Sequence, residues 1–164
     1  MANRSNKGAV SVLNKNMVII SSVVLFKKLR GNKKKWFLVK NMEEDNWEFP
    51  NTIVRKGESS ARAALRMMGE KGGMTVQVLE EAGRAGGATT LKDKTYPLRH
   101  IYYLLREKSG AEGEAIGFEE SSWFTYANAI RKLSKREQQM LRQAREELKA
   151  WEKRQEEKKE KKKK

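Results

Sequence analysis

The charged side chains whose spacing could support chemistry lie in one short stretch, residues 57–74. Positions 67, 70 and 71 are related as i, i+3 and i+4, so on a helix their side chains share one face. This chain places a thioether (Met67), a carboxylate (Glu70) and an ammonium group (Lys71) there. Mg²⁺ is commonly held by one or two carboxylates together with phosphate oxygens and water. Glu70 alone is a poor site, and Lys71 repels a dication by roughly 4 kcal/mol per unit charge at about 4 Å and an effective dielectric of 20.

The composition excludes several other kinds of site. The chain has no cysteine and one histidine, His100, which rules out disulfides, thiolate nucleophiles and multi-histidine metal sites. The longest apolar run, residues 17–26, contains two serines and is half the length of about 20 residues that a bilayer span needs. We therefore expect no membrane span, and the length of 164 residues suits one domain.

Hydrophobic patterning predicts a mixture of strands and helices. Strands are expected at residues 17–26, 36–40, 75–79, 99–106 and 121–124, the first two forming a hairpin. Residues 80–94 are expected to be a glycine-rich, variable stretch, and residues 109–117 a mobile loop.

Three helices are expected, each with a hydroxyl residue at its start. The first spans residues 59–70, capped by Ser59 or Ser60 and ended by two glycines. Its buried stripe is predicted at Ala61, Ala64, Leu65 and Met68. Thr125 is expected to cap the second helix, which ends at residue 133. Ser134 and Glu137 have the spacing of a capping box, and the long final helix that follows has a buried stripe ending at Trp151.

The net charge of +15 is concentrated at the two ends of the chain. Residues 1–40 contain ten Lys or Arg and no acid, residues 41–148 are balanced, and residues 149–164 contain nine basic and four acidic residues. We divide the chain into a basic arm (1–16), a folded domain (17–150) and a Lys/Glu-rich tail (151–164). Such ends favour polyanions such as RNA, and a solubilising tail without a dedicated partner is the alternative. The candidate polyanion-binding residues are Lys33, Lys34, Lys35, Lys161, Lys162, Lys163 and Lys164.

The first 16 residues also bear on localisation. They are basic and free of acids, but they contain only one arginine, Arg4, and no apolar segment typical of a secretory signal. We expect a disordered basic arm on a cytoplasmic protein, with a mitochondrial presequence as the alternative.

Residues 52–74, with Trp47-Glu48-Phe49-Pro50 before them, resemble the motif of the Nudix superfamily, G-x5-E-x7-R-E-U-x-E-E-x-G-U, where U is bulky and aliphatic. The matching residues are Glu58, Arg66, Glu70, Gly73 and Met74, and the departures are Thr52, Met67 and Lys71. The resemblance covers about residues 17–150. It implies an α+β fold, an α/β/α sandwich with a mixed β-sheet between helices, here followed by a basic C-terminal helix or tail.

The resemblance also implies a chemistry. In the superfamily three carboxylates on one helix face hold a divalent metal, which activates water to attack a bridging diphosphate. Carried over to an active enzyme, it implies Glu70 and Glu58 as catalytic and metal-binding residues, with Mg²⁺ or Mn²⁺ as cofactor. Glu119 or Glu120 is the candidate for a replacement metal ligand, and a solvated acidic turn is the alternative interpretation of that pair.

The motif residues that remain share a structural role. Glu58 and Arg66 are expected to form an ion pair that braces the loop against the helix, and Gly57 and Gly73 to form backbone turns. Two of the three motif carboxylates are replaced, by Met67 and Lys71. The pattern therefore supports the fold better than the reaction.

Three further residues are candidates for substrate contact. Dinucleoside polyphosphate hydrolases of the superfamily often carry a basic residue and aromatics where this chain has His100 and Tyr103. Trp47 could stack on a base, as aromatic rings do for about 1–3 kcal/mol. The alternative is that these aromatic rings fill the core.

Two functions stay open at this point. The first is a Nudix-fold protein with a degenerate motif, weak or inactive as a hydrolase, that binds a nucleotide, RNA or a ribonucleoprotein. The second is an active metal-dependent pyrophosphohydrolase that cleaves a nucleoside diphosphate linked to another group, such as a dinucleoside polyphosphate. Residues 123–133 resemble the segment after the last core strand in such hydrolases.

Overall fold

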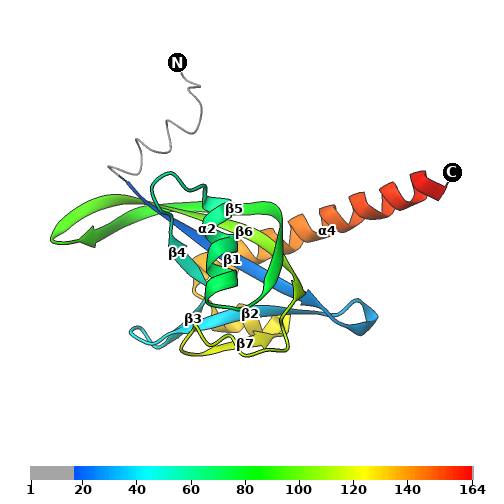
Figure 1. The fold of residues 1–164 in the computed structure, drawn as a ribbon, viewed down its shortest axis with the longest axis horizontal. Helices are drawn as coiled ribbons and strands as arrows, with labels where there is room; N and C mark the ends of the chain where they lie inside the picture. Colours follow the sequence, from blue (N-terminus) through cyan, green and yellow to red (C-terminus); the bar gives the residue numbers. More distant parts are fainter. Residues whose placement is uncertain (1–16, 164) are drawn as a thin grey trace, which may run out of the picture.

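The structure, a computed structural model, describes residues 17–163. The predicted basic arm (1–16) and Lys164 lie outside the described residues. A seven-stranded mixed sheet forms the middle layer, in the order β3-β2-β1-β6-β5, with β4 paired to β1 and β7 paired to β2. Helix α2 covers one face, and α3 and α4 cover the other (Figure 1). The predicted α/β/α sandwich is confirmed.

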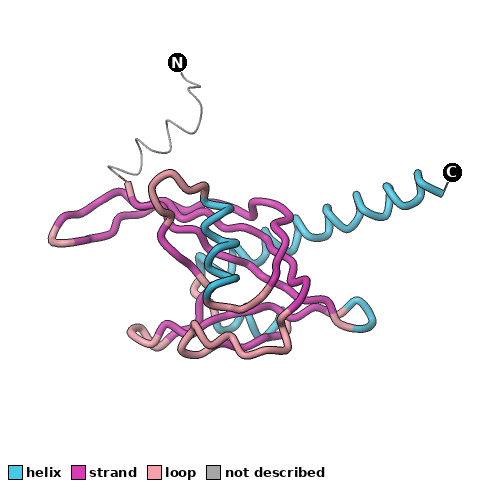
Figure 2. Tube along the Cα trace, viewed as in Figure 1, coloured by secondary structure: helices cyan, strands magenta, loops and turns pink. Residues whose placement is uncertain are grey.

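Figure 2 shows the strands and helices along the chain, and most of the predicted elements begin and end near their predicted positions. The strands are β1 (Val18–Lys28), β2 (Lys34–Asn41), β3 (Asn46–Glu48), β4 (Asn51–Ile53), β5 (Thr75–Leu91), β6 (Lys94–Ser109) and β7 (Ser121–Phe124). The helices are α2 (Ser60–Glu70), α3 (Tyr126–Lys132) and α4 (Lys135–Lys163), and the 3-10 turn Arg30–Asn32 joins β1 to β2.

Strand β1 lies at the centre because both of its faces are apolar. Val24 and Phe26 belong to the core beneath α3 and α4, whereas Val23 and Leu25 belong to the core beneath α2. The strand runs parallel to β6 and antiparallel to β2 and β4. A strand buried on both faces has a continuous apolar run rather than an alternating one, as residues 17–26 do.

The predicted buried stripe of α2 is confirmed at Ala64 and Met68, but the helix is rotated, so that Ala63 and Met67 are buried in place of Ala61 and Leu65. Its buried residues are Ala63, Ala64, Met67 and Met68. Leu65, predicted to be buried, is 39% exposed. The helix is rich in small and apolar residues, so two stripes fit it almost equally well. In the observed orientation Arg62 is exposed, and the Arg66 side chain, 18% exposed, pairs with Glu58.

The glycine-rich stretch at residues 80–94 is not a variable loop. It continues β5 and pairs with β6 in a long hairpin that extends beyond the sheet (Figure 1). Gly83 allows α4 to pack closely, since a Cβ there would lie 2.7 Å from Met140 Sδ. The hairpin turn uses Lys92 and Asp93, both at positive φ, so no glycine marks it in the sequence.

Helix α4 is continuous over 29 residues. Its first half packs on the sheet through the predicted stripe, ending at the half-buried Trp151. Its second half projects from the body as helix (Figure 1). Ser134 Oγ accepts the Glu137 N–H at 3.3 Å, which is one half of the predicted capping box.

Candidate functional site

The loop and helix that carry the motif are fixed by short-range contacts. Gly57 adopts φ +80°, a left-handed conformation that glycine takes without strain. Ser59 is the cap of α2, and its Oγ accepts the Arg62 N–H at 3.1 Å. The backbone N–H of Arg55 donates to Glu58 Oε1 at 3.1 Å, which holds the Glu58 carboxylate above the helix.

Arg66 lies close to both acids of the motif that remain. Its guanidinium contacts Glu58 through two hydrogen bonds, Nε to Oε2 at 2.8 Å and Nη2 to Oε1 at 3.0 Å. Its Nη1 lies 3.9 Å from Glu70 Oε2. The hydrogen bonds from Arg66 lower the pKa of Glu58, and the same contact raises the pKa of Arg66. Because a guanidinium already occupies the space between the two carboxylates, a divalent cation there would have to displace it.

Met67 does not share a surface with Glu70. Its side chain is 1% exposed and packs with Val23, Leu25 and Phe37 beneath α2. The convergence predicted for positions 67, 70 and 71 is therefore wrong for this residue. Only Glu70 and Lys71 lie at the exposed end of the helix.

Lys71 ends α2 and lies beneath a loop. Its carbonyl accepts the Gly117 N–H at 3.0 Å, and its Nζ lies 6.0 Å from the ring centroid of Phe118. A Cβ on Gly117 would lie 2.8 Å from the Lys71 carbonyl oxygen, so the close approach of this loop requires glycine. The predicted loop at residues 109–117 thus closes over the end of the motif helix.

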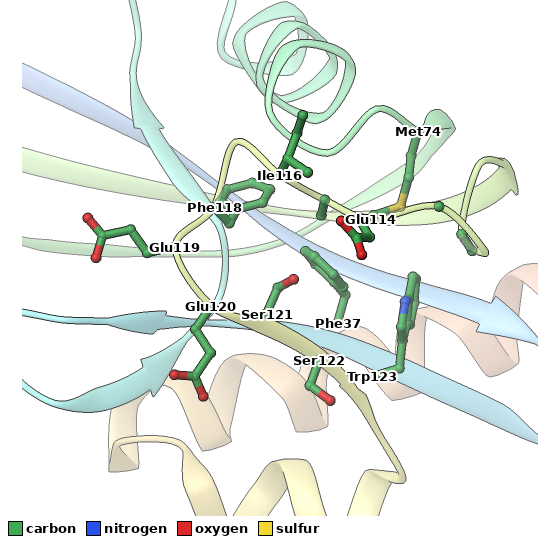
Figure 3. A pocket seen from close by; sticks show the side chains of 13 residues that line it. Phe37, Met74, Glu114, Ile116, Phe118, Glu119, Glu120, Ser121, Ser122 and Trp123 are labelled. Carbon is green, nitrogen blue, oxygen red and sulfur yellow. The ribbon is translucent and has the colours of Figure 1, made fainter.

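Two hollows flank that loop. The larger, about 710 Å³, has an apolar floor that includes Phe37, Met74 and Trp123, and its rim carries Glu114 (Figure 3). The smaller, about 410 Å³, contains Lys71 together with Glu48 and Asn51. Glu48 accepts hydrogen bonds from the side chains of Asn51 at 3.1 Å and Asn41 at 3.3 Å, so its carboxylate is already partnered.

Glu119 and Glu120 do not converge on the motif acids. They point in different directions from the segment before β7 (Figure 3), and both are exposed. Across residues 17–163, no group of three or more Asp, Glu or His side chains is arranged to hold a metal ion. The donor set of the described chain does not fit a Nudix metal centre.

The three candidate substrate contacts lie apart. His100 stacks on Tyr102 on the α4 face of the sheet, with its Nδ1 3.2 Å from Arg136 Nη2. The Tyr103 hydroxyl lies on the opposite face, 2.6 Å from Ser60 Oγ. Trp47 packs edge-on against Phe124. The structure therefore does not join His100 and Tyr103 into one site, because their odd and even positions on β6 alternate between faces.

Glu137, for which the sequence predicts only a role in a helix cap, joins three elements. It is buried, its Oε1 accepts the Phe49 N–H at 3.2 Å, and its Oε2 accepts the Tyr102 hydroxyl at 2.9 Å. Burial raises the pKa of Glu137 to about 7. Burial and the nearby Arg136 lower the pKa of His100 to about 4. A buried tyrosine opposite a buried acid, 35 positions apart in the chain, leaves no local pattern.

The predicted polyanion-binding lysines occupy two projecting elements. Lys33, Lys34 and Lys35 lie at the β1–β2 turn, and Lys161, Lys162 and Lys163 lie in the last turn of α4. The turn and the second half of α4 leave the body on the same side (Figure 1). Lys34 Nζ reaches Glu152 of α4 at 3.2 Å, so the two elements touch at one point.

Solved structures share the fold of this chain. An Ap4A hydrolase from Caenorhabditis elegans, in a binary complex, superposes with a TM-score of 0.62 and 21% identity over 81% of this chain and 98% of that chain. A MutT/Nudix family protein from Listeria innocua has a TM-score of 0.60 and 21% identity over 81% and 94% of the two chains. This chain has the Nudix fold.

A third Nudix structure extends the comparison. The Nudix domain of NrtR from Shewanella oneidensis, complexed with ADP-ribose, superposes with a TM-score of 0.59 and 19% identity over 80% of this chain and 88% of that chain. A scan against protein-family models gives no match for this sequence. A search of curated proteins also gives none. Within the described Nudix fold, no helix is both long and apolar enough to cross a bilayer.

Proposed function

We propose that this chain is a Nudix-fold binding module that has lost metal-dependent hydrolysis and binds RNA or nucleotides through its basic surfaces. The observation that carries the proposal is Lys71, which lies next to Glu70 at the exposed end of α2, at a position where the motif has a second acid. Lys71 therefore puts a positive charge where the motif has a carboxylate.

The remaining motif position supports the same conclusion. Met67 has no side-chain oxygen and is buried in the core, so this position supplies no ligand to a metal ion. The loop at Gly117 and Phe118 lies over Lys71 rather than leaving the helix end open. A metal ion bound by Glu70 alone would have one protein carboxylate as ligand, which is the smallest number that Mg²⁺ sites commonly use.

The charge distribution supports binding of polyanions. Within residues 17–163, much of the excess positive charge lies at the β1–β2 turn and on the second half of α4, which project from the body (Figure 1). Phosphate contacts from Lys and Arg dominate nucleic-acid affinity and make it strongly salt-dependent. We therefore place RNA or nucleotide binding on these elements and not in the hollow that Glu114 lines.

The test is a titration of the full chain with Mn²⁺, followed by phosphate release from a panel of nucleoside polyphosphates. We expect no saturable Mn²⁺ binding below about 1 mM, a range in which even weak protein Ca²⁺ sites bind. We also expect turnover no higher than that of Glu70→Gln. Metal-dependent turnover that disappears in Glu70→Gln would overturn the non-hydrolytic part of the proposal.

A second candidate is the active pyrophosphohydrolase, cleaving a nucleoside diphosphate linked to another group. One observation favours it: the Glu70 side chain is 59% exposed, and its contact with Arg66 is long at 3.9 Å. Glu70 therefore stays accessible to a cation carried in by a diphosphate. The titration above, repeated with a dinucleoside polyphosphate present, decides between the two functions.

A further inference from the structure

The β1–β2 turn meets α4 at Lys34 and Glu152, and a hollow opens on each side of that contact. One hollow, about 390 Å³, is lined by residues that include Lys28, Arg106 and Trp151. The other, about 350 Å³, is lined by residues that include Tyr126 and Arg145. Asn32 and Glu152 line both, so the two form one surface, here named the turn groove.

The turn groove is strongly basic. Its two hollows together are lined by seven Lys or Arg side chains and two Glu. One of these acids, Glu152, is already paired with Lys34 at 3.2 Å. The larger hollow described above, of about 710 Å³, is acidic instead, because Glu114, Glu119 and Glu120 line it and no Lys or Arg does. A phosphate chain is therefore attracted to the turn groove and repelled from the larger hollow.

Each hollow also contains an aromatic ring covered by a guanidinium. The Arg106 guanidinium lies 5.4 Å from the ring centroid of Trp151, and that of Arg145 lies 4.2 Å from the ring centroid of Tyr126. Trp151 and Tyr126 are half-buried, so each keeps part of its ring at the surface. Unpaired bases stack on aromatic rings and on arginine planes, whereas the bases of a duplex are hidden from them.

From this combination we infer that the turn groove binds single-stranded RNA, with phosphates on its lysines and bases on the Trp151 and Tyr126 stacks. The inference rests on the proposed function and names its partner and surface. An acidic protein segment would satisfy the lysines but would leave both aromatic stacks without a role. The two stacks and the lysines between them favour RNA over such a protein.

The test measures binding of a fluorescein-labelled 12-nucleotide single-stranded RNA to the full chain by anisotropy, from about 50 to 300 mM salt. Lys28→Glu with Lys153→Glu is expected to weaken binding at least tenfold at about 100 mM salt and to make the salt slope shallower, by about 0.7 for each phosphate that is no longer neutralised. Trp151→Leu keeps an apolar side chain and is expected to weaken binding about tenfold with an unchanged slope. It is also expected to lose part of the tryptophan quenching that RNA causes.

The matched control is Lys56→Glu with Lys94→Glu, which changes the charge equally at exposed positions away from the turn groove, and should alter affinity by less than threefold. Removal of residues 160–164 tests the tail separately. Three results would each overturn the assignment of RNA to the turn groove. They are an equal affinity for a duplex of the same length, an unchanged affinity in Trp151→Leu, and equal competition by polyglutamate. RNA binding that depends on residues 160–164 and not on Lys28 and Lys153 also overturns it but keeps the proposed function. No RNA binding at the lowest salt concentration overturns this assignment together with the RNA-binding part of the proposed function.

Discussion

At the scale of single residues, two adjacent serines of β1 are equally buried but differently partnered. Ser21 and Ser22 are both 0% exposed. Ser21 Oγ donates to the Ser60 carbonyl oxygen at 2.7 Å, which ties β1 to the first turn of α2. Ser22 Oγ has no hydrogen-bond partner among residues 17–163. A buried hydroxyl without a partner costs about 1–3 kcal/mol, and a satisfied one contributes about 1 kcal/mol.

We predict opposite effects of the same substitution at these two positions. Ser22→Ala is expected to raise the free energy of unfolding by about 1 kcal/mol, because it removes an unsatisfied hydroxyl. Ser21→Ala is expected to lower it by about 1 kcal/mol, because the Ser60 carbonyl loses its donor. Urea unfolding with an unchanged m-value measures both. Equal destabilisation by the two substitutions would mean that Ser22 has a partner such as an ordered water.

At the scale of elements, the orientation of α2 decides which motif positions can accept an acid. Lys71→Glu places a second carboxylate beside Glu70 at the exposed helix end, and we expect it to raise Mn²⁺ affinity at least tenfold over the wild type. Met67→Glu places a carboxylate in the core and is expected to cost several kcal/mol of stability without creating a site. Calorimetric Mn²⁺ titration and thermal unfolding measure the two effects.

Lys94→Glu is the control for the Lys71 substitution, because it changes the charge equally at an exposed position of the β5–β6 hairpin, outside the motif. It should leave Mn²⁺ affinity unchanged. A stable Met67→Glu variant that binds Mn²⁺ would contradict this orientation, because it would mean that position 67 faces solvent and not the core.

The elements also show what the sequence can predict. The start of α2 follows from Ser59, and that of α3 from Thr125, whose hydroxyl accepts the Asn128 N–H at 3.3 Å. The face of α2 did not follow from its apolar residues, because Leu65 competes with Met67. The extended β5 was missed because Gly83 suggested a loop, whereas its missing side chain makes room for Met140.

The candidate site was less predictable than the fold. The pairing of Glu58 with Arg66 was expected from the motif, and the structure has it at 2.8 Å. The closure of Gly117 over Lys71 and the burial of Glu137 against Tyr102 both depend on contacts between distant parts of the chain. Local spacing carries no signal for such contacts, which arise only once the sheet and helices are packed.

At the scale of the whole molecule, two buried groups make opposite contributions to pH-dependent stability. The raised pKa of Glu137, about 7, contributes stability that is complete below pH 4.5 and is lost as the pH rises through 7. The lowered pKa of His100, about 4, contributes stability that is present above pH 6.5 and is lost as the pH falls through 4. Between pH 4.5 and 6.5, folding takes up a proton at Glu137 and releases one from His100.

We therefore predict a shallow pH dependence of stability in the wild type over this window, and opposite slopes in two variants. His100→Asn should lose stability as the pH rises from 4.5 to 6.5, by about 2 kcal/mol from Glu137 alone. Glu137→Gln should lose stability as the pH falls over the same range, by a smaller amount because His100 is only partly buried. Urea unfolding at a series of pH values measures the slopes. Parallel slopes in the two variants would contradict the opposed proton linkage.

The unbroken path of α4 from the sheet into solvent has a geometric consequence. At about 1.5 Å per residue, the helix beyond Trp151 is about 18 Å long, and the packed half of α4 fixes the direction in which each side chain there points. An insertion of one residue after Trp151 would turn every later lysine by about 100° around the axis. An insertion of seven would return them almost to their original azimuth, about 10 Å farther out. The packed half of α4 therefore fixes both the direction of the lysines beyond Trp151 and their distance from the core.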